Sequence, residues 1–399
     1  MKTFLILLIA YTLSQFYRAF LAIVAGDLGR DLTLDAADLG SLSAIWFAAF
    51  ALAQFPVGWA LDRIGPKRTM AGLLTLAVIG AAWLGMAGGF AEALIAMALI
   101  GIGCSPVLMG SMYLFGRVYP PESFAMKSSL LIGFGSLGNL LGATPLALAV
   151  EALGWRHTMG AIAALTAVSA GLVLWLLKDP PRIDEGMPGS GSRGGLMDIV
   201  RLRPLWLLLP LTLTSYSAVI AIRSLWIAPF FSQVHGFDVT ERGNAALVMA
   251  IAMTVGALFY GPLERFIGHP KTTTLAGSML TGLCLLILGF FGAESAVLAL
   301  VLLAFVGAAG MSYAILMAHG RLFFPAHLLG RGVTFLNFAF IGGAGVVQWL
   351  SGQFVQAGQD AGTPAEAVFG QLHLAFGAAL LLAAALYALA PARPSAKAI

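Results

Sequence analysis

Two arginines interrupt stretches that are otherwise apolar. Arg18 lies within 3–26 and Arg223 within 205–232, at matching positions 205 residues apart. A guanidinium group inside a membrane is costly, stays charged and usually faces a water-filled cavity or a partner. Two such groups facing each other would repel unless an anion lay between them. The alternative is that both snorkel towards the headgroups, since each lies past the midpoint of its stretch. The pair therefore predicts either an anion site or two snorkelling cations.

Other side chains could complete such a site. Tyr11 and Gln15 (or Ser14) share a helical face with Arg18, and Tyr216 and Trp226 share one with Arg223. Further aromatic and polar residues on the helices expected to line a cavity could stack on a ring-bearing solute or hydrogen-bond to it. The candidates among them are Tyr17, Trp46, Tyr113 and Asn337. Most residues of this kind pack against helices or lipid, so each has an ordinary structural interpretation as well.

The composition requires a membrane to hold these residues. Of the 399 residues, 59% are hydrophobic and only 10% are charged, against about 25% charged in a soluble domain. Each membrane-spanning helix needs about 20 mostly apolar residues. The sequence predicts an all-α polytopic membrane protein with helices near 3–26, 38–60, 69–88, 91–115, 124–150, 157–177, 205–232, 244–263, 273–292, 295–318, 329–356 and 371–392. The first stretch resembles a signal peptide but lacks a convincing cleavage site, so we expect it to be a retained helix.

The twelve predicted helices fall into two similar halves. Gly65 and Gly268 lie 203 residues apart, and the Gly-Arg pairs 116–117 and 320–321 lie 204 apart, close to the arginine offset. We expect a six-helix bundle over 1–177, a cytoplasmic linker over 178–204 and a second six-helix bundle over 205–399. Two pseudo-symmetric halves suit a transporter whose site lies between them.

One loop carries the most specific motif. The stretch 58–68, GWALDRIGPKR, joins the second and third helices, and 261–271, GPLERFIGHPK, repeats it in weaker form. The spacing of glycine, acid and bases resembles the loop signature of the major facilitator superfamily. The resemblance implies that this loop closes the cytoplasmic side during an alternating-access cycle, with the following gating residues: Gly58, Asp62, Arg63, Gly65, Arg68, Arg117, Glu264, Arg265 and Arg321. Paired arginines on helices 1 and 7 also resemble the organophosphate antiporters of that superfamily.

The substrate remains open between three classes. A small organic anion is favoured by the arginines, a neutral ring-bearing nutrient such as a riboflavin-like vitamin by the aromatics, and copper by the methionine pairs 109/112 and 249/253, since thioethers can pass Cu(I). Packing is the simpler explanation of the methionines. No carboxylate lies in the middle of a helix, and His319 and His373 are the nearest titratable groups. The chain could therefore be a facilitator, an exchanger or a symporter whose substrate carries the proton.

Other classes of protein find less support. An enzyme would need a catalytic or metal-binding cluster at membrane depth, and the sequence shows neither this nor a nucleotide-binding loop. We expect no enzymatic activity, no cofactor, no metal site and no nucleic-acid partner. A non-transporting membrane assembly or receptor protein on the same fold is the alternative from another class.

Charge placement predicts the topology. Of 22 lysines and arginines, only Arg30, Arg156 and Arg242 fall in loops on one side, and all others except Arg18 and Arg223 fall on the opposite side. Cytoplasmic loops carry the excess of positive charge. We therefore expect a multi-pass, monomeric protein of the inner cell membrane, embedded in the lipid bilayer with both termini in the cytoplasm.

Overall fold

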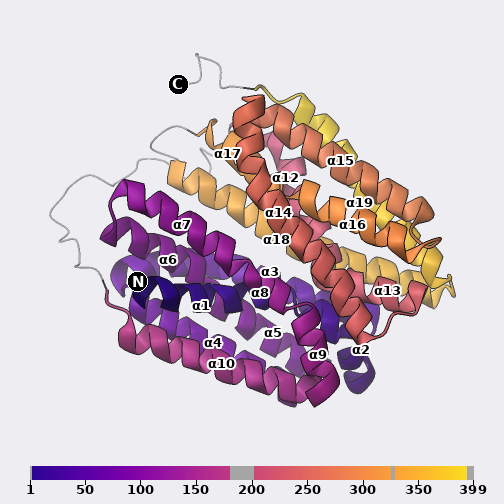
Figure 1. Cartoon of the computed structure of the whole chain (residues 1–399), viewed down its shortest axis with the longest axis horizontal. Helices are drawn as coiled ribbons and strands as arrows, with labels where there is room; N and C mark the ends of the chain where they lie inside the picture. The colour runs from indigo at the N-terminus through magenta and orange to yellow at the C-terminus, as the bar shows by residue number, and fades with distance from the viewer. Residues whose placement is uncertain (1, 180–201, 325–328, 393–399) are drawn as a thin grey trace. The chain divides into compact units, whose positions relative to one another are not determined.

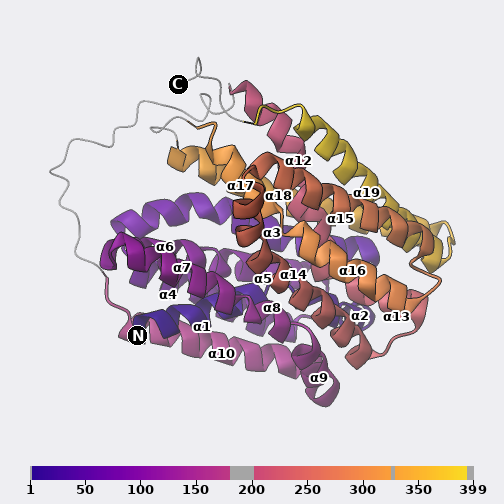
Figure 2. The same ribbon diagram turned by 45° about the horizontal axis from the view of Figure 1, so that its top comes forward.

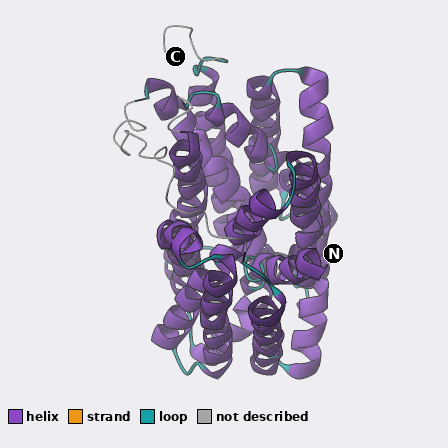
Figure 3. Ribbon diagram, turned by 90° about the vertical axis from the view of Figure 1, so that its left-hand side faces the viewer, coloured by secondary structure: helices purple, strands orange, loops and turns teal. Residues whose placement is uncertain are grey.

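The computed structural model describes residues 2–179, 202–324 and 329–392, and every regular element in these ranges is a helix (Figure 3). Eleven of the described helices are long and apolar enough to cross a membrane, or up to twelve if a bent pair at the N-terminus forms one span. The all-α polytopic class predicted from composition is therefore confirmed.

The elements before residue 180 form the first series of helices (Figure 1). They are α1 (Lys2–Phe16), α2 (Leu21–Leu32), α3 (Ala36–Arg63), α4 (Pro66–Met86), α5 (Phe90–Cys104), α6 (Pro106–Val118), α7 (Pro121–Gly135), α8 (Leu137–Leu141), α9 (Thr144–Leu153) and α10 (Trp155–Leu176). The second series contains α12 (Arg203–Ala221), the π-helical turn η1 (Ile222–Trp226), α13 (Ile227–His235), α14 (Val239–Ile267), α15 (Pro270–Phe291), α16 (Ala296–Gly310), α17 (Tyr313–Arg321), α18 (Leu329–Asp360) and α19 (Ala365–Ala388).

Local chemistry sets several helix starts. Asp35 accepts a hydrogen bond from the backbone N–H of Asp38, whose side chain accepts one in return, so a capping box begins α3. Gly65 adopts φ +99° and is followed by Pro66 at the first position of α4. Proline suits that position because its missing N–H would have no helical partner there.

The first predicted helix is not continuous, which corrects the expected span 3–26. The chain turns at 17–20, and α1 and α2 are bent by 50° relative to each other. Arg18 lies in this turn, where its N–H bonds to the Gln15 carbonyl instead of continuing the α-helical ladder. The segment Tyr17-Arg18-Ala19-Phe20 contains neither glycine nor proline, so its composition carried no sign of a break. Arg223 likewise lies in a non-α segment, the π turn η1.

The predicted helices 91–115 and 295–318 are also broken, at Ser105 and at 311–312. Pro106 explains the first break because it has no N–H to continue the ladder. Near each break a backbone carbonyl accepts a hydrogen bond from a side chain of a neighbouring helix, and the Ala309 carbonyl also accepts one from the Ser312 N–H at 3.1 Å. Gln54 Nε2 of α3 donates to the Ser105 carbonyl at 3.1 Å, and Tyr260 Oη of α14 donates to the Ala309 carbonyl at 2.8 Å. Both halves thus use the same arrangement at corresponding positions.

The predicted helix 124–150 consists of three segments, α7, α8 and α9 (Figure 2). Its glycines pack against α1: a Cβ on Gly135 would overlap the Tyr11 ring, and one on Gly138 would overlap the Thr12 carbonyl. Glycine is required here because the two helices approach too closely for any side chain. Gly135 and Gly138 therefore serve helix packing.

The described residues divide into two compact units. Unit 1 comprises Met1–Pro181, Ala221–Ala250 and Gln348–Ala365, and unit 2 comprises Arg182–Ile220, Ile251–Val347 and Glu366–Ile399. In unit 1 a buried apolar cluster joins α1, α4, α6, α7 and α10. The predicted division at 178–204 follows the repeat rather than these contacts, and it stays a prediction; residues 180–201 lie outside the described residues.

Candidate functional site

Unit 1 joins segments from both predicted halves at one end, where α2 and α13 end and α3, α10 and α14 begin; we call it the Asp31 end. Glycines set the closest approaches. A Cβ on Gly40 of α3 would lie 2.7 Å from the Cα of Gly352 on α18, and one on Gly243 of α14 would lie 2.6 Å from the Cβ of Ala147 on α9. The end is therefore closed by backbone-to-backbone packing that larger residues would prevent.

Hydrogen bonds reinforce this closure. The Gln356 side chain accepts from the Ala36 N–H at 3.0 Å, joining α18 to the start of α3. Two further pairs join α9 to the start of α14: Thr144 to Asn244, 2.8 Å, and Thr240 to Glu151, 2.6 Å. Each of these contacts joins residues more than 85 positions apart in the sequence.

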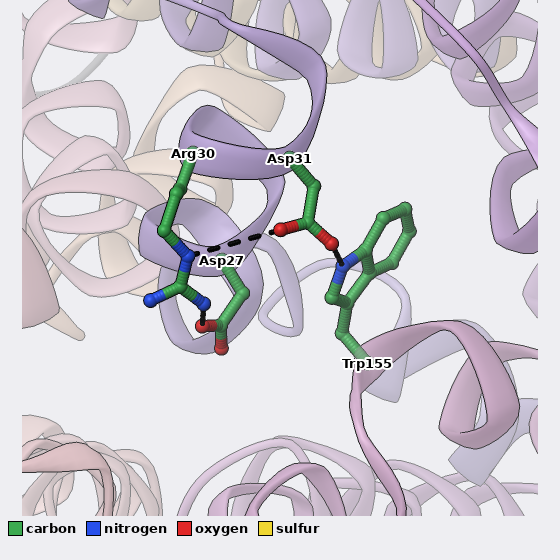
Figure 4. A network of polar contacts seen from close by, with 4 residues as sticks. All are labelled: Asp27, Arg30, Asp31 and Trp155. Atoms are coloured by element: carbon green, nitrogen blue, oxygen red, sulfur yellow. Dashed lines mark hydrogen bonds and ion pairs between the residues drawn. The ribbon is translucent and has the colours of Figure 1, made fainter.

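A charged network lies at the same end (Figure 4). Arg30 at the end of α2 forms ion pairs with Asp27 and with Asp31, the second at 3.7 Å. Trp155 Nε1, at the first residue of α10, donates to the other oxygen of Asp31 at 2.8 Å. Asp31 thereby ties the end of α2 to the start of α10, which fixes the segment that follows the Arg18 turn.

Arg223 is fully buried within unit 1. One terminal nitrogen, Nη2, donates to the backbone carbonyl of Asn139 at 2.6 Å. Asn139 lies in the five-residue helix α8, whose last carbonyls have no helical partner. The π turn adds one residue to the helix and re-aims the side chain that it carries, and such turns are frequent at functional sites. The guanidinium group is therefore anchored on one side only.

Arg18 lies half-buried over an aromatic pair. Its Cζ is 4.8 Å from the centre of the Phe50 ring, a cation–π contact. Phe50 in turn stacks on Trp46 at 5.3 Å, with the two rings 19° from parallel. Gly101 of α5 allows this arrangement, because a Cβ there would overlap the Trp46 carbonyl.

Polar contacts connect these rings to the Arg223 segment. Ser43, three residues before Trp46, hydrogen-bonds to the side chain of Gln348, and Trp226 Nε1 donates to Ser351 Oγ at 2.7 Å. Ser43 lies on α3, Trp226 on η1, and Gln348 and Ser351 on α18. We call the five residues Arg18, Trp46, Phe50, Arg223 and Gln348 the arginine cluster.

The arginine cluster contains buried hydrogen-bond donors without acceptors. Among the described residues, no partner lies within hydrogen-bond distance of the following atoms: Arg223 Nε and Nη1, Trp46 Nε1 and Gln348 Nε2. A buried donor left without an acceptor costs about 1–3 kcal/mol. All four atoms are donors, so each of them would be satisfied by an acceptor oxygen. A carboxylate or phosphate has this chemistry and would also neutralise the guanidinium charge.

The remaining predicted binding residues take other positions. In unit 1 Tyr11 packs against Gly135, Tyr17 Oη pairs with Thr166 Oγ1 at 2.9 Å, and Gln15 is half-buried with its Cβ against Gly138. Tyr113 lies 5.9 Å from the Arg117 guanidinium. Tyr216 and Asn337 belong to unit 2, where Tyr216 contacts the Tyr313 ring at 4.8 Å. Unit 1 thus contains Arg18, Trp46, Arg223 and Trp226 as well as Tyr11, Gln15, Tyr17 and Tyr113, and only Tyr216 and Asn337 of the predicted binding residues belong to unit 2.

Most of the predicted gating residues lie at or near the ends of their helices. Asp62, Arg63, Arg68 and Arg321 are exposed, and Gly58, Arg117 and Glu264 are half-buried; the side chain of Arg265 lies outside the described residues. An acidic residue that was not among the predicted gating residues contacts the loop between α3 and α4. Asp179 accepts a hydrogen bond from the Lys67 N–H at 2.7 Å and so caps α4, and a Cβ on Gly65 would lie 3.0 Å from its carboxylate.

Two members of the arginine cluster, Phe50 and Gln348, and the neighbouring Ser351 were not among the predicted binding residues. Phe50 was one of 26 phenylalanines and carried no distinguishing sign. Gln348 and Ser351 could have been found, because they place two polar side chains on one face of an apolar helix at spacing i, i+3. Of the histidines considered, His319 is buried in unit 2 and its Nδ1 hydrogen-bonds to Tyr387 Oη at 2.7 Å; His373 is also buried there.

Comparison with known proteins places the chain. The sequence profile of the Major Facilitator Superfamily matches residues 7–348. The D-galactonate transporter of Escherichia coli O6:H1 is 22% identical over 383 residues, covering 86% of each chain. The probable galactarate/D-glucarate transporter GudP of Pseudomonas putida is 24% identical over 344 residues, covering 76% of this chain and 74% of that protein.

Solved structures share the fold. A bacterial homologue of the human lysosomal transporter Spinster, in an inward-facing conformation, has a TM-score of 0.77 at 20% identity, covering 97% of this chain and 96% of that one. The nucleoside transporter NupG has a TM-score of 0.80 at 13% identity, covering 97% and 99%. The match of the family profile to most of the sequence, together with this shared fold, shows that the chain belongs to the Major Facilitator Superfamily.

Proposed function

We propose that this transporter carries a small hydroxylated carboxylate, of the sugar-acid class, bound at the arginine cluster. The observation that carries the proposal is the set of buried donors on Arg223, Trp46 and Gln348 that lack acceptors. The names of the similar proteins, which include D-galactonate and galactarate/D-glucarate transporters, support the same class. They do not favour a vitamin or copper as substrate.

Binding follows from the geometry of the donors. The carboxylate accepts charge-assisted hydrogen bonds from Nε and Nη1 of Arg223. Nη2 keeps its hydrogen bond to the Asn139 carbonyl and holds the guanidinium group in place. Hydroxyl groups of the same substrate offer acceptors to Trp46 Nε1 and Gln348 Nε2. Arg18 contributes positive charge from the Phe50 side. Among these residues no acid would repel the anion.

Transport then proceeds by alternating access. The Asp31 end, closed in unit 1, faces away from the cytoplasm, because it carries Arg30, Arg156 and Arg242, whereas all other lysines and arginines in the predicted loops belong to loops of the cytoplasmic side. Both termini are therefore cytoplasmic, and the protein works as a monomer in the inner cell membrane. Asp62, Arg63, Glu264 and Arg321 open and close the cytoplasmic side.

The test measures binding and flux of a defined panel. Purified protein is titrated with D-galactonate, D-glucarate and neutral D-galactose while thermal unfolding is recorded, and uptake of labelled D-galactonate is measured in proteoliposomes. A ligand that binds the folded state raises its stability with the logarithm of concentration over Kd. We expect the acids to stabilise the protein and D-galactose to have no effect.

Two variants separate charge from packing. Arg223→Gln should weaken the binding of the acid by about 10–150-fold, since hydrogen bonds to a charged group contribute about 1.5–3 kcal/mol. Trp46→Phe keeps the ring and removes one donor, and should weaken binding by less. Unchanged affinity in a folded Arg223→Gln protein, or equal stabilisation by D-galactose, would refute the anion site.

A further inference from the structure

A groove of about 360 Å³ runs between α4 and α10 of unit 1, away from the arginine cluster. Its lining residues are spaced 3, 1, 3, 3 on α4 and 3, 1, 3 on α10, so that one face of each helix contributes. They are Arg68, Ala71, Gly72, Thr75 and Val78 from α4, and Ala167, Ala170, Gly171 and Leu174 from α10. From Arg68 to Val78 the groove extends about 15 Å, at 1.5 Å per residue.

The walls of the groove are small and leave open space. A Cβ on Gly72 or on Gly171 would meet no atom within 4 Å. The hydroxyl group of Thr75 is turned inwards to its own helix, donating to the Ala71 carbonyl at 3.0 Å. The body of the groove therefore offers an apolar surface, about half as long as the hydrocarbon core of a bilayer, which is about 30 Å thick.

One end of the groove carries a positive charge. Arg68 lies in the first turn of α4, is exposed, and has no acidic group within 4 Å among the described residues. The nearby Asp179 carboxylate is directed to the Lys67 backbone instead. Because α4 begins here and α10 ends here, Arg68 is at the height of the lipid headgroups. Trp175, 81% exposed beside Leu174, marks the same boundary, where tryptophan is enriched.

We infer that this groove binds an anionic phospholipid of the leaflet whose headgroups lie at the level of Arg68. One acyl chain lies along the glycine and alanine wall, and the phosphate of the headgroup pairs with Arg68. The occupant is a lipid rather than a soluble anion, because an apolar groove on two membrane-spanning helices continues directly from the charged end. Both ends of the ligand are thus matched by the residues present.

The experiment is native mass spectrometry of the full-length protein released from mixed micelles. The micelles contain equal amounts of phosphatidylglycerol and phosphatidylcholine with the same acyl chains. We expect retained phosphatidylglycerol on the wild-type protein, and about fivefold weaker retention in Arg68→Gln, the contribution of one basic residue near a membrane surface. Lys178→Gln, at the same boundary but outside the groove, should change retention little.

The acyl-chain half of the inference is tested separately. Gly72→Leu and Gly171→Leu should fill the groove without a clash and reduce the retention of both lipids. Gly160→Leu, on the same helix α10 and also with open space around it, is the matched control. Equal retention of the two lipids by the wild-type protein, equal loss in Lys178→Gln and Arg68→Gln, or unchanged binding in both leucine variants would overturn the inference. Free phosphate that displaces the lipid at millimolar concentration would also overturn it.

Discussion

The contact between Gly40 and Gly352 gives a sharp test of how the Asp31 end closes. In Gly40→Ala the new Cβ would lie 2.7 Å from the Gly352 Cα and 2.9 Å from the Gln348 carbonyl oxygen. Carbon atoms pack best at about 3.5–4.0 Å, so α3 and α18 must separate by about 1 Å. Overpacking of this kind costs about 1–3 kcal/mol. The closed state should lose about 5–150-fold in population relative to the state with this end open.

Double electron–electron resonance measures that population. Spin labels on Leu153→Cys and Gln359→Cys report on the Asp31 end, since both sites are exposed there and both native cysteines are buried. The distance distribution of Gly40→Ala should gain a longer component. Gly342→Ala, on α18 with no atom within 4 Å of the added Cβ, controls for the helix propensity of alanine and should match the parent.

Two outcomes would refute the reasoning. If Gly40→Ala and Gly342→Ala give the same distribution, the close approach does not hold the closed end together. If Gly40→Ala loses thermal stability without any longer distance, the contact supports the fold of unit 1 rather than a conformational equilibrium.

Two further predictions concern hydrogen bonds described above. Tyr260→Phe removes one of the hydrogen bonds that the Ala309 carbonyl accepts, while the bond from the Ser312 N–H remains. It should lower the free energy of unfolding by about 0.5–1.5 kcal/mol, whereas Tyr216→Phe should change it by less than about 0.5 kcal/mol; equal melting temperatures for the two variants would argue against a stabilising role of the Tyr260 hydrogen bond. Asp179→Ala removes the cap of α4 and should cost about 1 kcal/mol, with Asp179→Asn costing less because an amide oxygen still accepts; hydrogen exchange at the Lys67 N–H checks this, and unchanged protection in Asp179→Ala would contradict it.

Much of the architecture could be predicted from apolar length and repeated landmarks. Gly65-Pro66 and Gly154, which separate apolar runs in the sequence, lie directly before or at the start of α4 and α10, and both glycines have a positive φ. The breaks could be predicted only in part. Pro106 announces one, but the turn at 17–20 has ordinary helix-forming residues. It depends on contacts far along the sequence, such as Tyr17 with Thr166, that no local pattern contains.

The candidate site was predictable to a similar degree. Arg18 and Arg223 stand out because charge inside an apolar helix is rare. Phe50 does not, since its role follows from lying under a guanidinium group. The sequence also did not show that Arg223 Nη2 would donate to the Asn139 carbonyl. That carbonyl can accept because α8 ends at Leu141 and leaves it without a helical partner.

The side-chain hydrogen bonds near the two helix breaks show how the two halves of a repeated chain can differ. Gln54 and Tyr260 share neither size nor functional group, yet each donates a hydrogen bond to a main-chain carbonyl near the helix break of its own half. The two halves share the main-chain carbonyl that accepts the hydrogen bond, whereas the side chain that donates it differs. In such chains the correspondence between the two halves is therefore clearer in the main-chain acceptors than in identical residues at matching positions.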